Sequence, residues 1–426
     1  MKQLFILLVI IVINLKGYDL ICQGVNNNYT VWQENLVFEK SVTNGQLYWS
    51  GDVEAGFGVP VVHVYGTPYE MGYAHGQLLA EGIGFVNDNY LAYFESEIGS
   101  IGDLPKWVVE LIDKYGFKMA LDLVADASKP YTPSYFYEEM QGVADGSGLP
   151  LKDVVRFHML PELVKASCSM FGAWDNAIPY QGEGLVHLRA LDWDTTSPLT
   201  LKPVVLVYHP SEGNTFMTLS FQGFIGAITG YSGHTGISEK VWASYNGSDS
   251  RFGEPFYFVL RDILQFDKTV DQALNRIYGA HRTCSIYVGV GSNSSMTFTA
   301  VEYSYETVRI FDDVTPFPIY APEYSPHELI PSVVYIDPDF YSADHQCMSN
   351  LLLKYYGTLT PENTIQIISH LQTGNLHAAI YDYYYNTFTF SVAGHNQTWP
   401  LTSNPTMAYN NQFIQLDVTS LFENKQ

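Results

Sequence analysis

The sequence predicts an α+β protein in which a mainly helical N-terminal section precedes a body rich in β-strands. Of its 426 residues, 46% are hydrophobic and 15% are charged, which is enough apolar material for a large buried core. Apolar residues follow mostly helical spacing between positions 51 and 167. From Cys168 onward, short runs of β-branched and aromatic residues alternate with turns, so the change of structure falls at residues 166–168.

The first 17 residues are typical of a secretory signal peptide. Lys2 gives a short basic start, and residues 4–15 form an apolar run that is too short to cross a bilayer as a helix. A second candidate cleavage region lies near Cys22, so the boundary is placed between 17 and about 22. No later segment has transmembrane length, and we expect no stable membrane insertion.

The N-terminal section, residues 18–167, begins with an Asn-rich stretch up to about residue 50 that predicts an irregular lead-in. A β-branched run at 58–65 predicts a strand. Thr67 and Pro68 then suit the cap and the first position of a helix. Helical spacing covers 71–93, 106–127, 135–144 and 151–165.

The body, residues 168–426, is dominated by predicted strands. They cover 168–176, 185–193, 204–208, 215–221, 286–290, 296–303 and 307–311, and a hairpin covers 377–392. Helices are predicted at 255–266, 270–279 and 361–371. Residues 312–346 are rich in Pro, Tyr and Asp and predict a long surface excursion.

The charge balance argues against a nucleic-acid-binding protein. The chain has 44 acidic and 21 basic residues, a formal net charge of -23, which opposes contact with phosphate backbones or anionic membranes. Sequons at Asn28, Asn246, Asn293 and Asn396, together with the signal peptide, predict a glycoprotein that is secreted or lies in the endolysosomal lumen.

Four cysteines, Cys22, Cys168, Cys284 and Cys347, are too few for a disulfide framework. If Cys168 stays free to react, Cys284 with Cys347 is the obvious possible pair. Two separately buried thiols are the alternative.

Four motifs in order surround Cys168. They are GTPYEMG with His75-Gly76, GVADGSG at 142–148, Cys168-Ser169, and Arg189-Ala-Leu-Asp192-Trp193. This succession, across about residues 55–395, resembles the acyl-CoA:6-aminopenicillanic acid acyltransferase family, also called the C45 peptidase family. More distantly it resembles acid ceramidase and choloylglycine hydrolase.

The resemblance implies an N-terminal nucleophile hydrolase with a four-layer αββα body, which needs no cofactor or metal. Such a protein is made as a precursor and cleaves itself before its cysteine. In this chain the cut would fall between Ser167 and Cys168, and residues 18–167 would remain as the smaller fragment, a partner of the larger fragment 168–426. By the same resemblance, Asp192 would hold the new α-amino group, and Arg189 would favour the thiolate and orient the acyl group.

The chemistry explains why such a cut is useful. A free thiol with a pKa of about 8.5 is mostly protonated at neutral pH, and an adjacent α-amino group with a pKa of about 8 can act as its base. A hairpin turning near Gln181 would bring Cys168 opposite Trp193 or Asp194. Because Arg189 and Asp192 face opposite sides of an ideal strand, we expect a bulge or the strand end to bring them together.

The oxyanion donor is less clear from the sequence. Related enzymes use an Asn soon after a strand ending in Val-Glu, but no Asn follows Val301-Glu302-Tyr303 before Asn350. Asn246 is a candidate donor, although glycosylation there would exclude it. A backbone amide is the alternative.

Ordinary structural roles compete with each chemical one. A lone Cys at the start of a strand is more often a small buried hydrophobe, and Arg189 with Asp192 could be a local ion pair. His75 is expected to cap or pack rather than bind a metal, because no second ligand stands at suitable spacing. His187 is expected to be a satisfied sheet residue.

The leading hypothesis is hydrolysis of linear non-peptide amides, N-acyl amines or N-acyl amino acids, through an acyl-Cys168 intermediate. The substrate would be a small or lipid-like amide. Acyl transfer through the same intermediate is the nearest alternative, and a non-catalytic secreted glycoprotein that keeps the fold is another. A papain-like protease is disfavoured, since no such signature surrounds Cys168.

Overall fold

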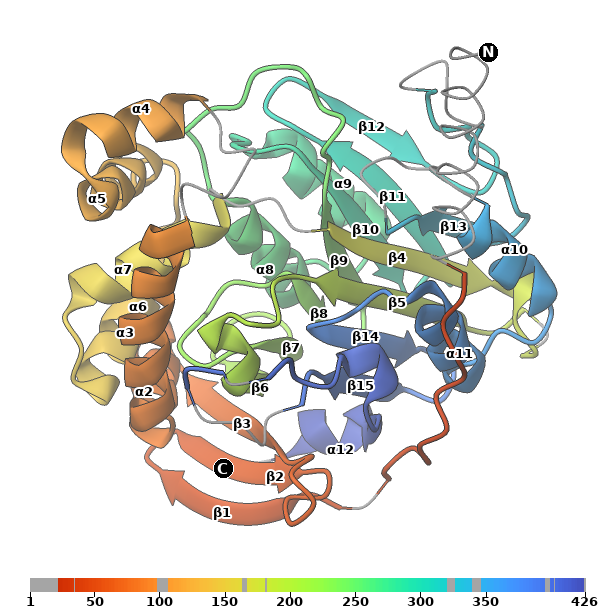
Figure 1. Cartoon of the computed structure of the whole chain (residues 1–426), viewed down its shortest axis with the longest axis horizontal. Helices are drawn as coiled ribbons and strands as arrows, with labels where there is room; N and C mark the ends of the chain where they lie inside the picture. The colour runs from red at the N-terminus through yellow and green to blue at the C-terminus, as the bar shows by residue number, and fades with distance from the viewer. Residues whose placement is uncertain are drawn as a thin grey trace, which may run out of the picture.

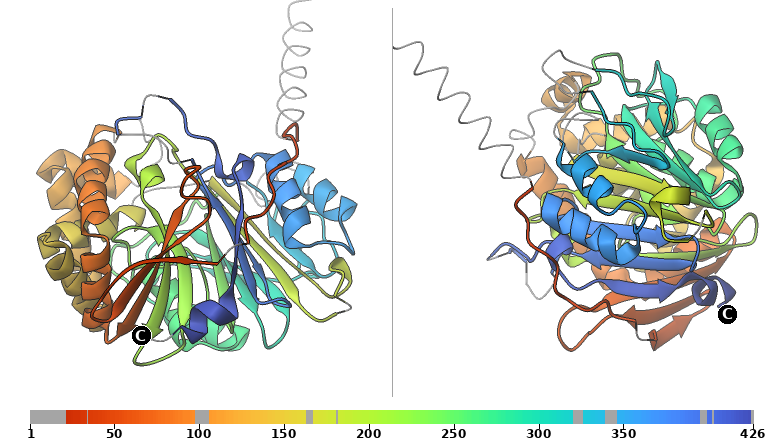
Figure 2. Two further views of the ribbon diagram at one scale, coloured as in Figure 1. Left: turned by 90° about the horizontal axis from the view of Figure 1, so that it is seen from below. Right: turned by 90° about the vertical axis from the view of Figure 1, so that its right-hand side faces the viewer.

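The computed structural model describes residues 22–33, 35–97, 106–162, 167–180, 182–319, 326–338, 346–394, 399–401 and 403–424. Two β-sheets pack face to face, and helices cover the outer face of each (Figures 1 and 2). The layers are therefore helix, sheet, sheet and helix, and the predicted αββα arrangement is confirmed. The signal peptide predicted at residues 1–17 lies outside the described residues.

The larger sheet has ten strands in the order β1-β2-β3-β6-β7-β8-β9-β10-β11-β12. Only β3 and β6 pair in parallel among these neighbours. The strands are β1 (Val37–Val42), β2 (Gly45–Ser50), β3 (Val59–Gly66), β6 (Pro203–Pro210), β7 (Phe216–Phe221), β8 (Thr229–Tyr231), β9 (Thr235–Val241), β10 (Ile286–Ser292), β11 (Thr297–Tyr303) and β12 (Val308–Phe311).

The smaller sheet is antiparallel, with the order β13-β4-β5-β14-β15-β16. Its strands are β4 (Ser167–Trp174), β5 (Leu185–Asp192), β13 (Val333–Ile336), β14 (His377–Asp382), β15 (Thr387–Val392) and β16 (Ile414–Asp417). Strand β4, which begins next to the predicted cleavage point, is thus an interior strand of this sheet. Its neighbours β13 and β5 fix its path on both sides.

Helices of the N-terminal section and the body form the outer layer on the ten-stranded sheet. They are α2 (Pro68–Leu78), α3 (Ala80–Glu97), α4 (Lys106–Tyr115), α5 (Phe117–Ser128), α6 (Ser134–Ser147), α7 (Leu151–Met159), α8 (Phe256–Phe266) and α9 (Val270–Gly279). Helix α2 begins as predicted, because Thr67 and Glu70 make a reciprocal capping box before Pro68. No helix in these described stretches is long and apolar enough to cross a membrane.

The opposite outer layer consists of α10 (Cys347–Lys354) and α11 (Pro361–Leu371), which pack on the six-stranded sheet. Helix α12 (Val418–Glu423) follows β16 near the C-terminus. The sheets lie close together at Gly172 of β4, where an added Cβ would lie 2.1 Å from the Phe298 side chain of β11. The glycine there allows the aromatic ring to fill the space between the layers.

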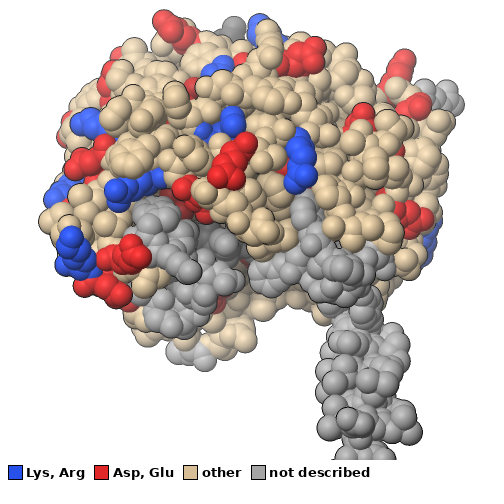
Figure 3. All heavy atoms as spheres, turned by 90° about the horizontal axis from the view of Figure 1, so that it is seen from above, with Lys and Arg blue, Asp and Glu red and all other residues tan. Residues whose placement is uncertain are grey.

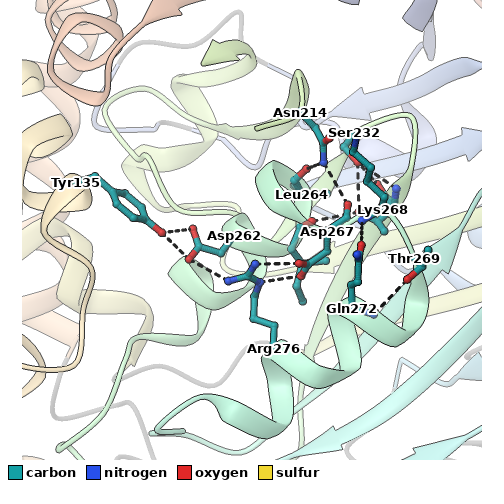
Figure 4. A network of polar contacts seen from close by, with 12 residues as sticks. Tyr135, Asn214, Ser232, Asp262, Leu264, Asp267, Lys268, Thr269, Gln272 and Arg276 are labelled. Atoms are coloured by element: carbon teal, nitrogen blue, oxygen red, sulfur yellow. Dashed lines mark hydrogen bonds and ion pairs between the residues drawn. The ribbon is translucent and has the colours of Figure 1, made fainter. Parts of the chain in front are cut away.

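A polar network joins the N-terminal section to the body (Figure 4). Tyr135 of α6 donates its hydroxyl to the Asp262 carboxylate of α8 at 2.6–2.7 Å. Arg276 of α9 forms an ion pair with Asp262 at 3.5 Å and a two-pronged pair with Asp267 at 2.7 and 2.9 Å. The Tyr135–Asp262 contact joins the two sections independently of the peptide link between them, and the Arg276 pairs fix Asp262 within the body.

Two predictions about irregular regions are wrong. The lead-in at residues 18–50 contains β1 and β2, which extend the ten-stranded sheet beyond β3. The stretch 312–346 contains β13, whose four apolar residues are buried against β4. The β13 error arises because its partner β4 is far away in the sequence, whereas β1 and β2 form a local hairpin that turns at Thr43 and Asn44 and was overlooked.

Neither the possible Cys284–Cys347 pair nor the alternative of two separately buried thiols is present. Cys347, at the start of α10, is bonded to Cys22, and Cys284 is a free thiol. Cys284 directly precedes β10 of the ten-stranded sheet, whereas α10 lies outside the six-stranded sheet. The two sheets separate these cysteines, which sequence spacing alone could not show.

Candidate active site

Cys168 lies at the beginning of β4 and is fully buried. It pairs with Leu191, and Ser167 pairs with Asp192, in a register that continues without a break to Trp174 and Leu185. The hairpin predicted from sequence is present, but its register differs by two or three residues from the expected pairing with Trp193 or Asp194. Arg189 is therefore paired with Met170 and lies nearer to Cys168 than the expected pairing would place it.

Arg189 reaches the sulfur of Cys168. Its side chain is fully buried, and one terminal nitrogen, Nη2, lies 3.6 Å from Cys168 Sγ and 3.3 Å from Glu239 Oε2. The guanidinium Nε donates to the backbone oxygen of Glu239 at 3.3 Å. The other terminal nitrogen, Nη1, donates to Nε2 of His377 at 2.8 Å. A buried cation is thus held by a carboxylate and an imidazole beside the thiol.

Two members of this group, Glu239 and His377, were missed by the sequence reasoning. Glu239 comes from β9 of the other sheet, and His377 from β14, where it pairs with Leu191. Both side chains are buried. His377 begins the hairpin predicted at 377–392, whereas Glu239 lies in a strand that was not predicted. Glu239 stands between Ser238 and Lys240 rather than in an apolar run, so no local pattern identified it.

Asp192 lies on the other side of the strand. Its carboxylate accepts hydrogen bonds from the Thr373 hydroxyl at 2.6 Å and from the backbone N–H groups of Gly374 and Asn375 at 2.8 and 2.9 Å. Thr373 also contacts the hydroxyl of Ser169 at 2.7 Å. The segment before β14 therefore fixes Asp192 at the strand end, directly across from Ser167.

The expected bulge between Arg189 and Asp192 is absent from the described hairpin, and the two side chains are not brought together. Residues 189 and 192 keep to opposite faces, as the pleat requires. Arg189 contacts the side chain of Cys168, whereas Asp192 lies beside the backbone where β4 begins. An α-amino group at residue 168 would be part of that backbone, so each side chain has a different target.

Burial controls the ionisation of the group. It raises the pKa of the Cys168 thiol to about 12, and Arg189 offsets this only in part. Burial also raises the pKa of Asp192 and of Glu239, against the effect of their hydrogen-bond donors or of Arg189, and burial and Arg189 together lower the pKa of His377. In the uncut chain Cys168 is therefore a protonated thiol that needs a base.

An apolar cavity of about 670 Å³, including its open mouth, adjoins the Arg189–Glu239 pair. These two are its charged lining residues; the remainder of its wall is apolar or aromatic. Helices of the N-terminal section contribute Tyr90 and Phe157, and the body contributes residues such as Trp193, Phe221 and Phe224. Both sections are therefore needed to enclose the cavity.

Comparison with known proteins places this site in a family. No protein-family model matches the chain. Protein dcd1A of Dictyostelium discoideum is 44% identical to it, over 99% of this chain and 98% of that protein. The chain belongs to the dcd1 family. A match of this length and identity covers every element of the site, from α3 to β14.

More distant relatives extend the comparison for this dcd1 family member. Acid ceramidase of Rattus norvegicus is 27% identical over 38% of this chain and 46% of that enzyme, so the predicted relationship to acid ceramidase is confirmed. Among solved structures, the Caenorhabditis elegans N-acylethanolamine-hydrolyzing acid amidase ortholog aligns with a TM-score of 0.39 at 15% identity. That alignment covers 51% of this chain and 93% of the amidase.

Other residues singled out in the sequence lie apart from Cys168. Asn246 is exposed in the loop after β9, where the Tyr245 hydroxyl donates to the backbone oxygen of Ser248 at 3.0 Å. The structure does not bring Asn246 together with the described site residues.

The two histidines singled out in the sequence have structural partners. His75 packs as expected, with Nε2 accepting from the Gly223 N–H at 3.1 Å. His187 contacts the Ser238 hydroxyl at 3.1 Å within the sheets.

The sequons differ in their surroundings. Asn28 is exposed, like Asn246, whereas Asn293 is partly buried and its amide donates to the Gly233 oxygen at 2.8 Å. Asn396 lies outside the described residues. Among the residues with a described position, no three His, Cys, Asp or Glu side chains gather as a metal site would require.

Proposed function

We propose that this protein hydrolyses linear non-peptide amides through an acyl intermediate on Cys168, after cleaving itself between Ser167 and Cys168. The proposal rests on one observation: the two charged residues of the Arg-x-x-Asp motif lie on opposite faces of β5 and have different neighbours. Arg189 lies against the sulfur, and Asp192 lies against the start of β4. Acid ceramidase and the N-acylethanolamine-hydrolyzing amidase are amide-cleaving enzymes by name, and they supply the reaction class.

Self-cleavage would produce the missing base. The Cys168 thiol adds to the carbonyl carbon of Ser167, the C–N bond between the two residues breaks, and the acyl group passes to sulfur. Water then hydrolyses this thioester, which leaves a carboxylate on Ser167 and a free thiol and α-amino group on Cys168. The new amine, beside Asp192, can take the thiol proton in each later turnover.

Turnover would follow the same course with an external amide. The sulfur bonds to the acyl carbon, the amide C–N bond breaks, and the departing amine takes a proton from the α-ammonium group. Water hydrolyses the acyl-Cys168 thioester and releases the acid. Arg189 stabilises the thiolate and the charge that develops near it, because a cation in a buried site acts strongly on a neighbouring anion.

The cavity favours an apolar acyl group over a charged one. Its wall is apolar apart from the Arg189–Glu239 pair at the end nearest the sulfur. Fatty or aromatic acyl chains would bury their surface there, while the amide remains beside the polar pair. Nucleic acid is not a candidate substrate; on the face drawn in Figure 3, Lys and Arg side chains are interspersed with acidic ones, and the net charge is -23.

The oxidised Cys22–Cys347 pair favours an oxidising compartment, as do the exposed sequons Asn28 and Asn246. We therefore propose a secreted or endolysosomal location after removal of residues 1–17. Since Cys22 is used in this bond, signal removal beyond it would abolish the disulfide. The cleavage candidate near Cys22 must then lie upstream of that residue.

The deciding experiment combines maturation with turnover. Purified protein is analysed by mass spectrometry for the fragment beginning at Cys168, and the cut protein is assayed against N-acyl amines and N-acyl amino acids of increasing chain length. Release of free acid by cut protein alone supports the proposal. An unbroken Ser167–Cys168 link in active protein contradicts it, and transfer to an added amine without acid release would instead indicate an acyltransferase.

A further inference from the structure

His377 is a buried histidine that the mechanism above does not use. It begins β14, pairs with Leu191 of β5, and is 1% exposed. Its Nε2 atom lies 2.8 Å from Arg189 Nη1 and 3.2 Å from the Thr229 hydroxyl. The ring of Phe221, which lines the apolar cavity, lies 6.0 Å away, centroid to centroid.

The contact with Arg189 defines the chemical form of His377. A guanidinium nitrogen can only donate, so Nε2 must be the accepting atom and the ring proton must lie on Nδ1. An imidazolium at this distance would repel the guanidinium. Burial and Arg189 both lower the pKa of His377, so the ring stays neutral at lower pH than a free histidine does.

This geometry leaves one orientation for the guanidinium. His377 accepts from Nη1, and Glu239 accepts from Nε through its backbone and from Nη2 through its carboxylate. With these positions taken, Nη2 is also directed at Cys168 Sγ. Without an acceptor at His377, the cation would lose one of the fixed points that direct it to the sulfur.

We propose that His377 is a positioning residue for the reaction: its neutral Nε2 orients Arg189 so that the guanidinium stabilises the Cys168 thiolate. This inference rests on the proposed function and deepens it. His377 itself contacts neither the sulfur nor, in the mechanism above, the substrate. The charged or titratable groups around this arrangement are Arg189 on β5, Glu239 and Lys240 on β9, Cys168 on β4 and Asp192 at the end of β5.

Two polar substitutions separate positioning from packing. In His377→Gln the side-chain oxygen can occupy the place of Nε2, whereas in His377→Asn the shorter side chain reaches only the place of Nδ1. We expect the Asn variant to lose about tenfold or more in kcat, and the Gln variant to lose no more than about threefold, because only Gln preserves a hydrogen bond to a charged partner. KM should change little in either variant.

A second readout needs no substrate. The rate at which iodoacetamide alkylates Cys168, followed by mass spectrometry across pH, reports the fraction of thiolate. The midpoint should move to higher pH in His377→Asn and stay near that of the unmodified protein in His377→Gln. His63→Gln, which removes another fully buried imidazole in β3, is the matched control and should leave the profile unchanged.

Equal behaviour of the Asn and Gln variants, whether both active or both impaired, would overturn the positioning role. Each protein is first checked for the fragment that begins at Cys168. If the unmodified protein is active without that cut, the proposed function fails. If it is cut and active but the two variants do not differ, only the inference about His377 fails.

Discussion

At the scale of single residues, Arg189 and Asp192 lie on two faces of one strand, and the proposed mechanism gives each of them a separate task. Arg189 lies on the face of Cys168 Sγ, and Asp192 lies at the strand end with Thr373 and Gly374. Because a pleated strand directs residues three apart to opposite sides, the Arg-x-x-Asp spacing is suited to a nucleophile whose side chain and backbone both take part. An enzyme with a separate histidine base would not require this spacing.

Cys168→Ala should leave the chain uncut and inactive, since it removes the atom that attacks the Ser167 carbonyl. Mass spectrometry of the purified variant for the fragment beginning at residue 168 is the measurement. Cys284→Ser is the control, because Cys284 is the other free thiol of the described chain and lies before β10. Normal cutting of Cys168→Ala would show that another protease does the cutting.

Asp192→Asn should slow turnover by up to roughly 10²–10⁴-fold, the usual contribution of general acid–base catalysis, because the α-amino base would lose the group that holds it. The substitution keeps the shape and the contacts with Gly374 and Asn375 but removes the charge that would hold the α-ammonium group. The rate of acid release from a cleaved substrate is the measurement. Unchanged activity in correctly cut protein would remove Asp192 from the site.

At the scale of elements, the loop between β7 and β8, residues 222–228, forms part of the cavity wall and is held by the N-terminal section. The Gly223 N–H donates to His75 Nε2 at 3.1 Å, and the Ile225 N–H donates to His158 Nε2 at 3.0 Å. The His158 ring also stacks on Phe224, with centroids 5.1 Å apart. Two histidines of the N-terminal section therefore shape a cavity beside Cys168 of the body.

His158→Leu should destabilise the protein by about 1–3 kcal/mol, because the buried Ile225 N–H would lose its acceptor. It should also raise KM for substrates with long acyl chains more than for short ones, since Phe224 loses its support. Denaturant unfolding and chain-length kinetics measure the two effects. His370→Leu, at a partly buried histidine in the last turn of α11, is the control, and an equal effect there would show that the loop contact is unimportant.

At the scale of the whole molecule, the Cys22–Cys347 bond joins the two expected fragments. Cys22 belongs to residues 18–167 and Cys347 to residues 168–426. Cut protein should therefore migrate as one species on a non-reducing denaturing gel and as two after reduction. Cys22→Ser should give two bands without reduction, and a single band in that variant would contradict either the cut or the bond.

The free energy of unfolding should be largest between about pH 4.5 and 6.5. Burial raises the pKa of Glu162 to about 7 and of Glu254 to about 8, from 4.5 in the unfolded chain. Between pH 4.5 and about 8 the folded state then holds more protons than the unfolded chain. The free energy of unfolding therefore falls as the pH rises through this range. Burial lowers the pKa of His75 to about 3 and of His158 to about 4, from 6.5.

The histidines have the opposite sign, because the unfolded chain holds more protons below pH 6.5 and stability falls as the pH drops towards 4. Chemical denaturation at a series of pH values measures the profile. Glu254→Gln should flatten the decline above pH 6.5 and leave the acidic side unchanged. A profile that rises steadily to pH 8 would contradict these assignments.

Much of the fold followed from local pattern. The strands around Cys168 and the capped helix after Thr67 were predicted within a few residues, because alternation, turn residues and caps act over short distances. The strands β8, β9 and β13 were not predicted; β8 has only three residues, and β9 and β13 pair with β10 and β4, which are remote in the sequence. The same reason explains why the Cys22 partner was missed.

The sequence by itself determined the α+β class, the αββα arrangement through the family pattern, and the residues Cys168, Arg189 and Asp192 that make up the candidate site. Only the tertiary structure decided that Glu239 and His377 hold Arg189, that Arg189 and Asp192 keep to opposite faces, and that Cys22 bonds Cys347. A chain carries its local preferences in adjacent residues. Contacts between residues 50 to 325 positions apart depend on how the two sheets pack, which no short stretch encodes.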